Sequence, residues 1–278
     1  MSKKDIIEYY DYTLPFYKYF YHGDTHGIHY GYWDSKTKNH NEALLNTNQF
    51  LSEKALIKSD DYILDAGCGV GGSSIWLAKN YKTRVAGITL SERQVKKAEK
   101  LAIENNVNDL TTFYQRDFLN SGFEDETFSV VWAIESVCYA ENKKDFLREA
   151  YRVLKKGGRL IIWDGFQYRK PQNKKEAKDL NTFCEGWAVP NLAEVSEFKQ
   201  SLRDVGFREV KEFDVSKESH PSSKKIYKMS IWSYPLSIFF NKLKLVPNLL
   251  VKNNLSGIVQ YRIIKKNIAK MMVYYAEK

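Results

Sequence analysis

Residues 61–72 read DYILDAGCGVGG, and this stretch decides the fold of the chain. It predicts a buried parallel strand from Tyr62 to Ala66, a glycine-rich turn, and a helix from about Ser73 to Asn80. Glycine lets the backbone of the turn take positive φ and approach a ligand without a Cβ in the way. The helix start adds unpaired N–H groups and the positive end of the helix dipole. The stretch is therefore typical of a turn that binds a nucleotide.

The neighbours of the turn indicate which nucleotide it binds. Gly67, Gly69 and Gly72 also fit the dinucleotide fingerprint, a motif that is weak on its own. Asp65 lies at the carboxyl end of the strand, where a carboxylate repels a pyrophosphate but suits an ammonium group. The next predicted strand, residues 83–89, is followed by Leu and Ser and lacks the acidic residue that a dehydrogenase places on its ribose. The sequence favours an adenosyl ligand with a cationic amino-acid tail and no phosphate, which is S-adenosylmethionine.

Strand and helix patterns alternate after residue 61, which predicts an α/β fold with a doubly wound, mostly parallel sheet of seven strands. Ser91 and Gln94 read as a capping box for the helix after the second strand. Residues 165–190 are expected to form an irregular connection. The strands are predicted at Tyr62–Ala66, Thr83–Thr89, Thr111–Gln115, Phe128–Ile134, Arg159–Asp164, Phe207–Val215 and Met271–Ala276.

The 278 residues are expected to form a single domain. Residues 1–56 carry many aromatic side chains at helical spacing and are interpreted as an N-terminal helical lid. Residues 57–215 form the core. Residues 216–267 form a basic, aromatic helical insertion, and residues 268–278 a closing edge strand.

The net charge of +9 is concentrated near the C-terminus, where residues 215–278 contain twelve Lys or Arg and two Glu. Three interpretations stay open: a solvated face, an acidic substrate, or peripheral contact with a membrane. The sequence lacks the run of about 18 apolar residues that a membrane-spanning helix needs. The three cysteines have no metal-ligand spacing, so we expect no metal site, a reducing compartment and a cytoplasmic location.

Several motifs between about residue 9 and residue 165 together resemble class I S-adenosylmethionine-dependent methyltransferases. The resemblance is strongest to the branch that holds sterol, tocopherol, sugar O- and prenyl-diphosphate C-methyltransferases, next to cyclopropane fatty acid synthases. It implies a Rossmann-like methyltransferase fold. The motifs are Tyr10-Asp11, IHYGYWD (28–34), LDAGCGVGGSS (64–74), VAGITLSERQ (85–94), Arg116-Asp117, FEDETFSVVWAIES (123–136) and EAYRVLKKGGRL (149–160).

The resemblance also implies contacts with the cofactor, S-adenosylmethionine, at matching positions of this sequence. The residues expected at its methionine part are Asp65, Gly67, Cys68, Gly69, Ala133, Ile134 and, from the lid, Tyr10. Those expected at the ribose are Thr89, Leu90 and Gln94. Those expected at the adenine are Asp117, as acceptor for the amino group, and Phe118, beside the ring.

The acceptor is expected to be a small, largely apolar molecule of isoprenoid or lipid type. Relatives that methylate oxygen often carry a histidine shortly after the Glu-Ser pair, whereas residues 135–139 read ESVCY and place Tyr139 there. This favours methylation at carbon, with Glu135 as base and aromatic faces that stabilise a carbocation. His29 is a second candidate base. O- or N-methylation of an aromatic, sugar or alkaloid-like molecule stays open, and a nucleic-acid partner is disfavoured because an N/D-P-P-Y-type motif is absent.

Overall fold

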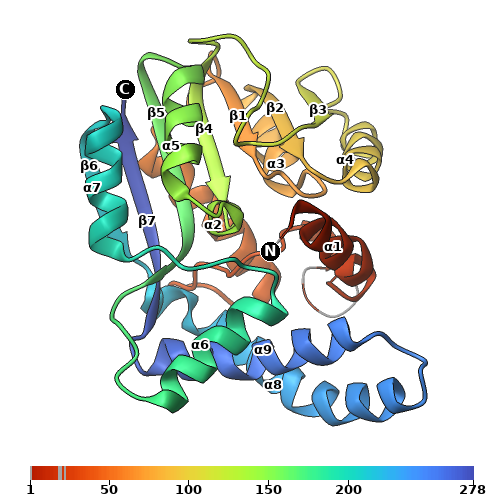
Figure 1. Ribbon diagram of the computed structural model, residues 1–278. Coiled ribbons are helices and arrows are strands. Elements are labelled where there is room, and N and C mark those ends of the chain that lie inside the picture. The colour runs from red at the N-terminus through yellow and green to blue at the C-terminus, as the bar shows by residue number, and fades with distance from the viewer. Residues whose placement is uncertain (1, 18–20, 22) are drawn as a thin grey trace.

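A computed structural model describes residues 2–17, 21 and 23–278, except for the side chains of residues 16 and 17. Its strands are β1 (Tyr62–Ala66), β2 (Arg84–Thr89), β3 (Thr111–Gln115), β4 (Phe128–Ile134), β5 (Leu154–Gln167), β6 (Arg208–Asp214) and β7 (Ala269–Glu277). They form one seven-stranded sheet in the order β3-β2-β1-β4-β5-β7-β6 (Figure 1). Strands β1 to β5 are parallel, and β7 is antiparallel to both of its neighbours. The predicted doubly wound, mostly parallel sheet is confirmed.

Helices cover both faces of the sheet. They are α1 (Lys3–Tyr17), α2 (His40–Lys54), α3 (Gly72–Tyr81), α4 (Glu92–Glu104), α5 (Lys143–Val153), α6 (Lys174–Gly186), α7 (Val195–Val205), α8 (Ser216–Lys242) and α9 (Asn248–Lys265). One face is covered by α5 and α7, which bury Phe146 and Phe198 against it. The other face is covered by α2 and α3 through Leu51 and Leu77. These helices pack their apolar faces on the apolar strands, and this packing holds the strands in place. The carboxyl ends of the parallel strands therefore have fixed positions.

Strand β7 corrects one prediction, because residues 268–278 are not a closing edge strand. It lies between β5 and β6 and pairs with both. Its burial fits this internal place, since Val273, Tyr274 and Ala276 have 0% exposure. The edge of the sheet on this side is β6, most of whose residues are exposed.

Helix α6 corrects a second prediction, because it occupies half of the stretch 165–190 that was expected to be irregular. Two of its three buried residues are acids, Glu176 and Asp179. Glu176 pairs with Arg169 at 2.8 Å, and Asp179 pairs with Arg262 of α9. Leu180 and Phe183, three residues apart, are partly buried against Ile263 and Ala269, so the helix has a short apolar face beside its buried acids.

The N-terminal segment lies across the carboxyl ends of the parallel strands. Helix α1 sits below β2 and β3 in Figure 1, and its residues line the same cavity as the turns that follow β1 to β4. The loop over residues 26–34 is fixed to α8, because Gly31 N donates to Ser222 Oγ at 2.9 Å and Trp33 N donates to the Glu218 carbonyl at 3.0 Å. Residues 18–20 and 22 of the predicted lid lie outside the described residues.

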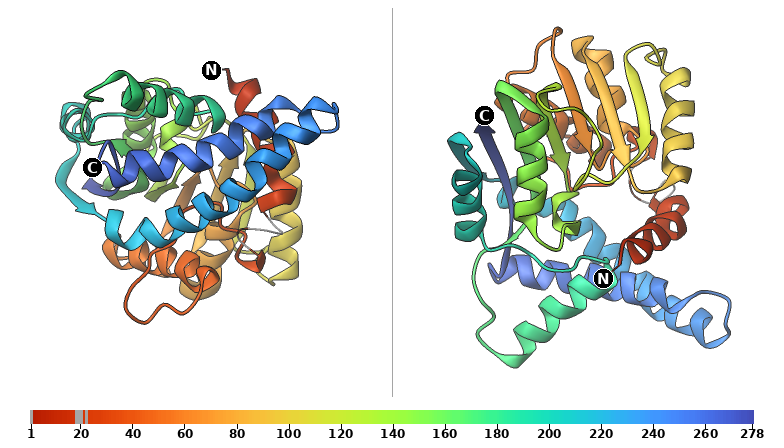
Figure 2. Two further views of the ribbon diagram at one scale, coloured as in Figure 1. Left: turned by 90° about the horizontal axis from the view of Figure 1, so that it is seen from below. Right: turned by 45° about the horizontal axis from the view of Figure 1, so that its top comes forward.

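Helices α8 and α9 form a hairpin that, with α6, makes a layer beneath the carboxyl ends of the strands (Figure 2). The hairpin is tightly packed, since a Cβ on Gly257 would lie 2.0 Å from Ser230 Oγ. Helix α6 approaches α9 equally closely, because a Cβ on Gly186 would lie 2.1 Å from Ser256 Oγ. Within the described ranges, none of the helices has both the length and the apolar character needed to cross a membrane.

Candidate active site

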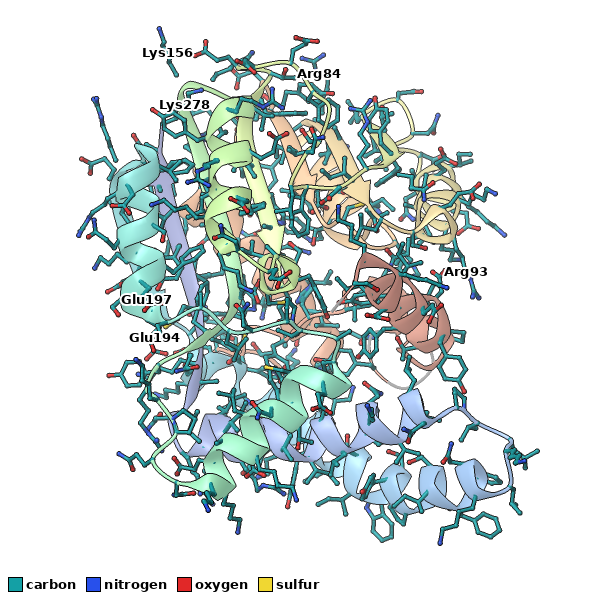
Figure 3. All side chains as sticks on the ribbon, viewed as in Figure 1. Arg84, Arg93, Lys156, Glu194, Glu197 and Lys278 are labelled. Atoms are coloured by element: carbon teal, nitrogen blue, oxygen red, sulfur yellow. The ribbon has the colours of Figure 1, made fainter. Side chains whose placement is uncertain are left out.

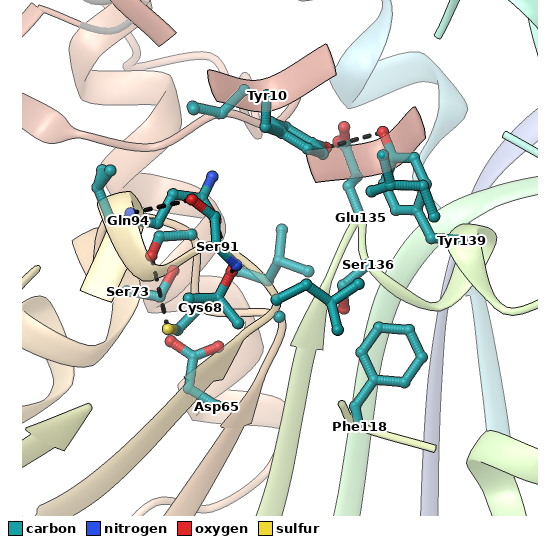
Figure 4. Close-up of a pocket in the computed structure, with 18 of the residues that line it drawn as sticks. Tyr10, Asp65, Cys68, Ser73, Ser91, Gln94, Phe118, Glu135, Ser136 and Tyr139 are labelled. Atoms are coloured by element: carbon teal, nitrogen blue, oxygen red, sulfur yellow. Dashed lines mark hydrogen bonds between the residues drawn. The ribbon is translucent and has the colours of Figure 1, made fainter. Parts of the chain in front are cut away.

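Two cavities meet at the carboxyl edge of the sheet. The first, of about 130 Å³, is lined by the turns after β1, β2, β3 and β4 and by α1 (Figure 4). The second, of about 690 Å³, lies between the strand ends and helices α1, α6, α8 and α9. Five residues line both: Tyr10, Ile28, His29, Glu135 and Tyr139. The three residues predicted to be catalytic therefore form part of the wall between the two cavities.

The glycine-rich turn forms the floor of the first cavity. Gly67 has φ of 91°, which favours glycine, and a Cβ there would lie 2.4 Å from the Cβ of Ser136. The N–H groups of Gly67 and Cys68 both donate to the Ile88 carbonyl at 2.9 Å, which holds the turn against β2. At Gly72, a Cβ would lie 2.8 Å from the His26 carbonyl oxygen. The turn is thus shaped by close backbone approach on two sides.

Asp65 lies at the end of β1, beneath this turn, and is 3% exposed. Its Oδ2 accepts a hydrogen bond from Ser74 Oγ at 2.6 Å. Burial raises the pKa of Asp65 to about 6, although the Ser74 hydrogen bond opposes the shift. A buried carboxyl in such a place is stabilised by a cationic partner. Asp65 therefore fits the α-ammonium group of a bound amino acid.

The turn after β2 presents the residues predicted for the ribose. Thr89 Oγ1 donates to Gln94 Oε1 at 2.5 Å. Ser91 Oγ accepts from Gln94 N at 3.2 Å, so the predicted N-cap is confirmed. The second half of a capping box is not formed, because the side chain of Gln94 bonds to Thr89. Ser91 Oγ also donates to Asp11 Oδ1 at 2.6 Å, which ties α1 to this turn.

The turn after β3 holds the residues predicted for the adenine. Asp117 Oδ2 pairs with Lys3 Nζ at 2.5 Å, and its Oδ1 accepts from Leu119 N at 2.9 Å. Phe118 makes an edge-to-face contact with Phe146, with ring centroids 5.4 Å apart. Asp117 and Phe118 both line the first cavity, so a ring held there would meet an acceptor oxygen and an aromatic surface.

The first cavity brings together eleven of the twelve residues predicted to contact the cofactor. These are Tyr10, Asp65, Gly67, Cys68, Gly69, Thr89, Leu90, Gln94, Asp117, Phe118 and Ile134. The exception is Ala133, which does not line the cavity and is a correction. Its side chain has 0% exposure and packs in the core between the sheet and the helices. Side chains alternate along a strand, so Ile134 faces the cavity and its neighbour Ala133 faces the core.

Glu135 follows β4 in a left-handed backbone conformation with φ of 46°, which is uncommon for a residue other than glycine. Its Oε1 accepts from Tyr30 N at 2.7 Å and from Trp163 Nε1 at 3.3 Å. In the described part of the chain, both side-chain hydrogen bonds of Glu135 are made by Oε1 and none by Oε2. Burial raises the pKa of Glu135 to about 8, and the nearby Asp164 adds to this shift. A buried carboxyl with one oxygen held in place is suited to accept a proton.

His29 and Tyr139 differ in what they can do at the shared wall. His29 Nδ1 lies 2.9 Å from the Tyr30 carbonyl oxygen, which can only accept, so Nδ1 donates and Nε2 is the basic nitrogen of the neutral ring. Tyr139 OH accepts from Tyr10 OH at 2.7 Å and donates to the Trp187 carbonyl at 3.3 Å. Burial raises the pKa of Tyr139, so its hydroxyl keeps its proton. Tyr139 offers an aromatic surface and His29 a basic nitrogen.

The second cavity is largely apolar. Among the described residues, the charged side chains that line it are Glu135, Asp164 and Lys270. Lys270 Nζ already pairs with Asp214 at 2.6 Å. Asp164 accepts from the N–H groups of Cys138 and Gly165, and burial raises its pKa to about 6. The cavity therefore suits an apolar molecule better than an anion.

Sequence reasoning missed several residues that line the two cavities. In the first cavity these include Lys3, Ser73, Ser91, Arg116 and Ser136. A signal existed for Ser73 and Ser91, since both stand at helix starts beside the predicted turns. In the second cavity, much of the lining comes from α8 and α9. No local pattern indicates that a helical hairpin faces strand ends that lie far earlier in the chain.

Comparison with known proteins gives the same family assignment. Residues 64–162 match the model of a methyltransferase domain. The chain is 31% identical, over 196 residues, to the 27-O-demethylrifamycin SV methyltransferase of Amycolatopsis mediterranei, covering 70% of this chain and 71% of that protein. It is 28% identical, over 275 residues, to the sterol 24-C-methyltransferase of Saccharomyces cerevisiae, covering 97% of this chain but 66% of that protein. The chain thus spans about two thirds of the length of these relatives.

Solved structures show the same fold. The cyclopropane synthase MmaA2 from Mycobacterium tuberculosis superposes with a TM-score of 0.85 at 14% identity, covering 100% of this chain and 99% of that one. The geranyl diphosphate C-methyltransferase from Streptomyces coelicolor superposes with a TM-score of 0.76 at 19% identity, covering 99% of this chain and 96% of that one. The likeness extends over the hairpin α8–α9 as well as the core.

Proposed function

Because this chain belongs to the class I S-adenosylmethionine-dependent methyltransferases, we propose that it methylates a small apolar acceptor of isoprenoid or lipid type at a carbon atom. The observation that carries this proposal is the wall shared by the two cavities. A narrow cavity with a buried carboxylate meets a large apolar one, and Glu135 stands between them. The names of relatives that methylate sterol carbon support the acceptor class.

The first cavity fits S-adenosylmethionine. Asp65 would hold the ammonium group, Thr89 and Gln94 the ribose hydroxyls, and Asp117 the adenine amino group. When bound, this cofactor supplies an electrophilic methyl group. The protein must then hold the acceptor carbon in line and exclude water. Tyr10 and Tyr139, joined by a hydrogen bond of 2.7 Å, close the wall on the side of α1.

Glu135 acts as the base in this mechanism. A new carbon–carbon bond to an alkene leaves a positive charge on the acceptor. Loss of a proton from the carbon next to that charge restores a double bond, and Oε2 of Glu135 takes this proton. Tyr30 N and Trp163 Nε1 hold Oε1, so the carboxylate keeps one orientation while Oε2 reacts. The aromatic ring of Tyr139 on the same wall stabilises the cation before the proton leaves.

Methylation of oxygen or nitrogen is the second candidate function, and His29 is the observation that favours it. Its Nε2 is the basic nitrogen, and the residue lines both cavities. A hydroxyl acceptor would give its proton to this nitrogen, whereas a neutral amine needs no base. The name of one relative, 27-O-demethylrifamycin SV methyltransferase, indicates an oxygen atom as methyl acceptor and supports this alternative.

The test measures methyl transfer from S-adenosylmethionine with a deuterated methyl group to a panel of sterols, quinols, isoprenoid alkenes and amines. We expect a labelled product whose NMR spectrum places the methyl group on carbon. Glu135→Gln should keep the affinity for S-adenosylhomocysteine and lower kcat about 100-fold or more. The matched control is Glu141→Gln, an exposed carboxylate just beyond the same loop. Unchanged turnover of Glu135→Gln on a verified acceptor would remove the base assignment.

Cellular location and the basic insertion complete the proposal. We propose that the enzyme works in the cytoplasm and touches a membrane through residues 216–267. The three cysteines are free, in keeping with a reducing compartment. The hairpin formed by the insertion lines the acceptor cavity. A lipid-like acceptor could therefore reach the cavity from a membrane that the hairpin contacts.

A further inference from the structure

We propose that the outer part of the α8–α9 hairpin docks on an anionic lipid bilayer and that the acceptor enters the large cavity through this docked surface. The inference rests on the proposed function, because it concerns the acceptor of that reaction. The α8–α9 hairpin would form the entrance to the large cavity, and this entrance would face the lipid.

The hairpin carries an unusual concentration of exposed apolar side chains. Eleven large apolar residues are exposed in the described ranges of the chain, and seven of them lie within residues 231–245. Trp232 is 79% exposed and Leu245 is 67% exposed. We call the seven residues the apolar tip: Ile231, Trp232, Leu236, Phe239, Phe240, Leu243 and Leu245. Apolar exposure that is concentrated in one segment of fifteen residues indicates an interaction site rather than chance exposure.

Part of the apolar tip is also the wall of the acceptor cavity. Trp232, Leu236 and Phe240 line that cavity while they remain exposed. Val246 and Leu250, in and after the turn of the hairpin, line it as well. An apolar molecule can therefore pass from the tip to the cavity along apolar side chains. This continuity favours a lipid surface, from which the acceptor moves directly, over a protein partner that would cover the entrance.

The charge around the apolar tip complements anionic lipids. No acidic residue occurs between Glu218 and Glu277 in the sequence. Lys224 and Lys228 on α8 and Lys242 and Lys244 at the end of the hairpin are all exposed. Figure 1 shows that this end of the hairpin projects beyond the rest of the molecule. Lysines around a tryptophan-containing apolar surface are typical of segments that lie in the membrane interface.

The first experiment measures co-sedimentation with vesicles of phosphatidylcholine alone and of phosphatidylcholine with phosphatidylglycerol. We expect binding to the anionic vesicles that weakens as salt is added, because exposed charges are screened. Lys242→Glu with Lys244→Glu should weaken binding roughly thirtyfold or more. Phe239→Ser with Leu243→Ser should also weaken it at least about tenfold. Neither Phe239 nor Leu243 lines the cavities, so affinity for S-adenosylhomocysteine should not change.

The matched controls make the same kinds of substitution at other places on the surface. Lys155→Glu with Lys156→Glu reverses two exposed charges, and Lys156 lies at the opposite end of the molecule (Figure 3). Ile103→Ser removes an apolar side chain that is 63% exposed on α4. Both controls should bind anionic vesicles like the unchanged protein. Equal loss in the controls would overturn the assignment of the surface.

A second measurement locates the contact. Brominated lipids quench tryptophan fluorescence at short range, so vesicles that contain them should quench the unchanged protein more than Trp232→Phe. Equal quenching, or no binding to either vesicle, would overturn the proposal. A concentration-dependent dimer that Phe239→Ser with Leu243→Ser abolishes, without vesicle binding, would assign the tip to a second copy instead. Vesicle binding without methyl transfer to any apolar acceptor would refute the proposed function and leave the docking surface intact.

Discussion

At the scale of single residues, Glu135 has three features that each lower the stability of the folded state. Its carboxyl group is desolvated although the residue keeps some exposure, its backbone is left-handed, and Asp164 lies near it. Burial raises its pKa to about 8, so between pH 4.5 and 8 the folded state binds more protons than the unfolded one. The free energy of unfolding therefore falls as pH rises through this window. Such a destabilised carboxyl is typical of a functional site.

This predicts that Glu135→Gln stabilises the folded protein at pH 8 while it removes activity. Glutamine can still accept the hydrogen bonds from Tyr30 N and Trp163 Nε1, but it carries no buried charge. The gain should be on the order of a few kcal/mol at pH 8, a Tm increase of about 5 °C or more, and should fall below about 1 kcal/mol at pH 5. Thermal melts of both proteins at the two pH values measure it. A variant that is less stable than the unchanged protein at pH 8 would contradict the strained-carboxyl interpretation.

Asp65 gives a second prediction at this scale, for the pH dependence of cofactor binding. Its pKa is raised to about 6 and it binds a cation best when ionised, so affinity for S-adenosylhomocysteine should fall as pH drops below about 6. Asp65→Asn should weaken binding about 10- to 100-fold at pH 7.5, as expected for a lost charge-assisted hydrogen bond, and should remove the pH dependence. Calorimetry at several pH values measures both effects. The exposed Asp109→Asn serves as the control, and a persistent pH dependence in Asp65→Asn would assign it to another group.

At the scale of elements, α1 is joined to the cofactor cavity at three points. Tyr10 bonds to Tyr139, Asp11 to Ser91 and Lys3 to Asp117, at 2.7, 2.6 and 2.5 Å. The helix reaches two turns on one side of the cavity and the loop after β4 on the other. These contacts place α1 against the cavity, and its role as a lid stays a prediction.

The lid predicts faster release of the cofactor when one contact is removed. Asp11 lines neither cavity, so Asp11→Ala changes the attachment of α1 without touching a ligand. The dissociation rate of S-adenosylhomocysteine should rise roughly fivefold, as expected for one partly exposed hydrogen bond. Stopped-flow fluorescence measures this rate. Glu8→Ala is the control on the same helix, because in the described part of the chain Glu8 pairs only with the neighbouring Lys4 at the surface. An unchanged rate in Asp11→Ala would show that α1 is a fixed wall.

Some of the helices and strands could be predicted from the sequence, and others could not. The strands around 61–72 could be predicted because apolar runs, glycines and a helix cap agree there. Helix α6 was missed, because its apolar face is short and its most buried side chains are acids. Residues 271–276 were recognisable as a strand, but its internal place depends on pairing with β5 and β6, which no local pattern encodes. Ala133 and Ile134 were both expected at the cofactor, but successive side chains of a strand point to opposite faces, so Ile134 lines the cavity and Ala133 packs in the core.

At the scale of the whole molecule, the cofactor site and the acceptor site are built in different ways. The cofactor cavity comes mainly from consecutive strand ends, and motifs predicted its turns but not side chains such as Lys3, Arg116 and Ser136. The acceptor cavity joins the N-terminal loop, the ends of β4 and β5, and helices α6, α8 and α9. Its shape depends on how closely those helices approach each other. The two sites should therefore respond separately to mutation.

The close contact between α8 and α9 provides that test. Gly257 and Ser230 both line the acceptor cavity, and a Cβ on Gly257 would lie 2.0 Å from Ser230 Oγ. Gly257→Ala should push the helices apart, raise KM for the acceptor and destabilise the fold by about 1–3 kcal/mol of overpacking, partly offset by better helix propensity. Affinity for S-adenosylhomocysteine should not change. Gly165→Ala is the matched control, because it lines the same cavity and its Cβ would meet only Met271 Sδ at 3.8 Å.

A second substitution, Ser230→Ala, tests whether the effects of Gly257→Ala arise from the close contact between the two helices. Ser230→Ala removes the oxygen that the new Cβ meets, so the double variant should recover part of the stability and of the acceptor KM. The thermal melt and steady-state kinetics of the two single variants and the double variant give the coupling between the positions. If Gly257→Ala weakens cofactor binding as strongly as acceptor binding, the two cavities are one cooperative unit. The hairpin then shapes the whole site, and its motion on a membrane would reach the cofactor as well.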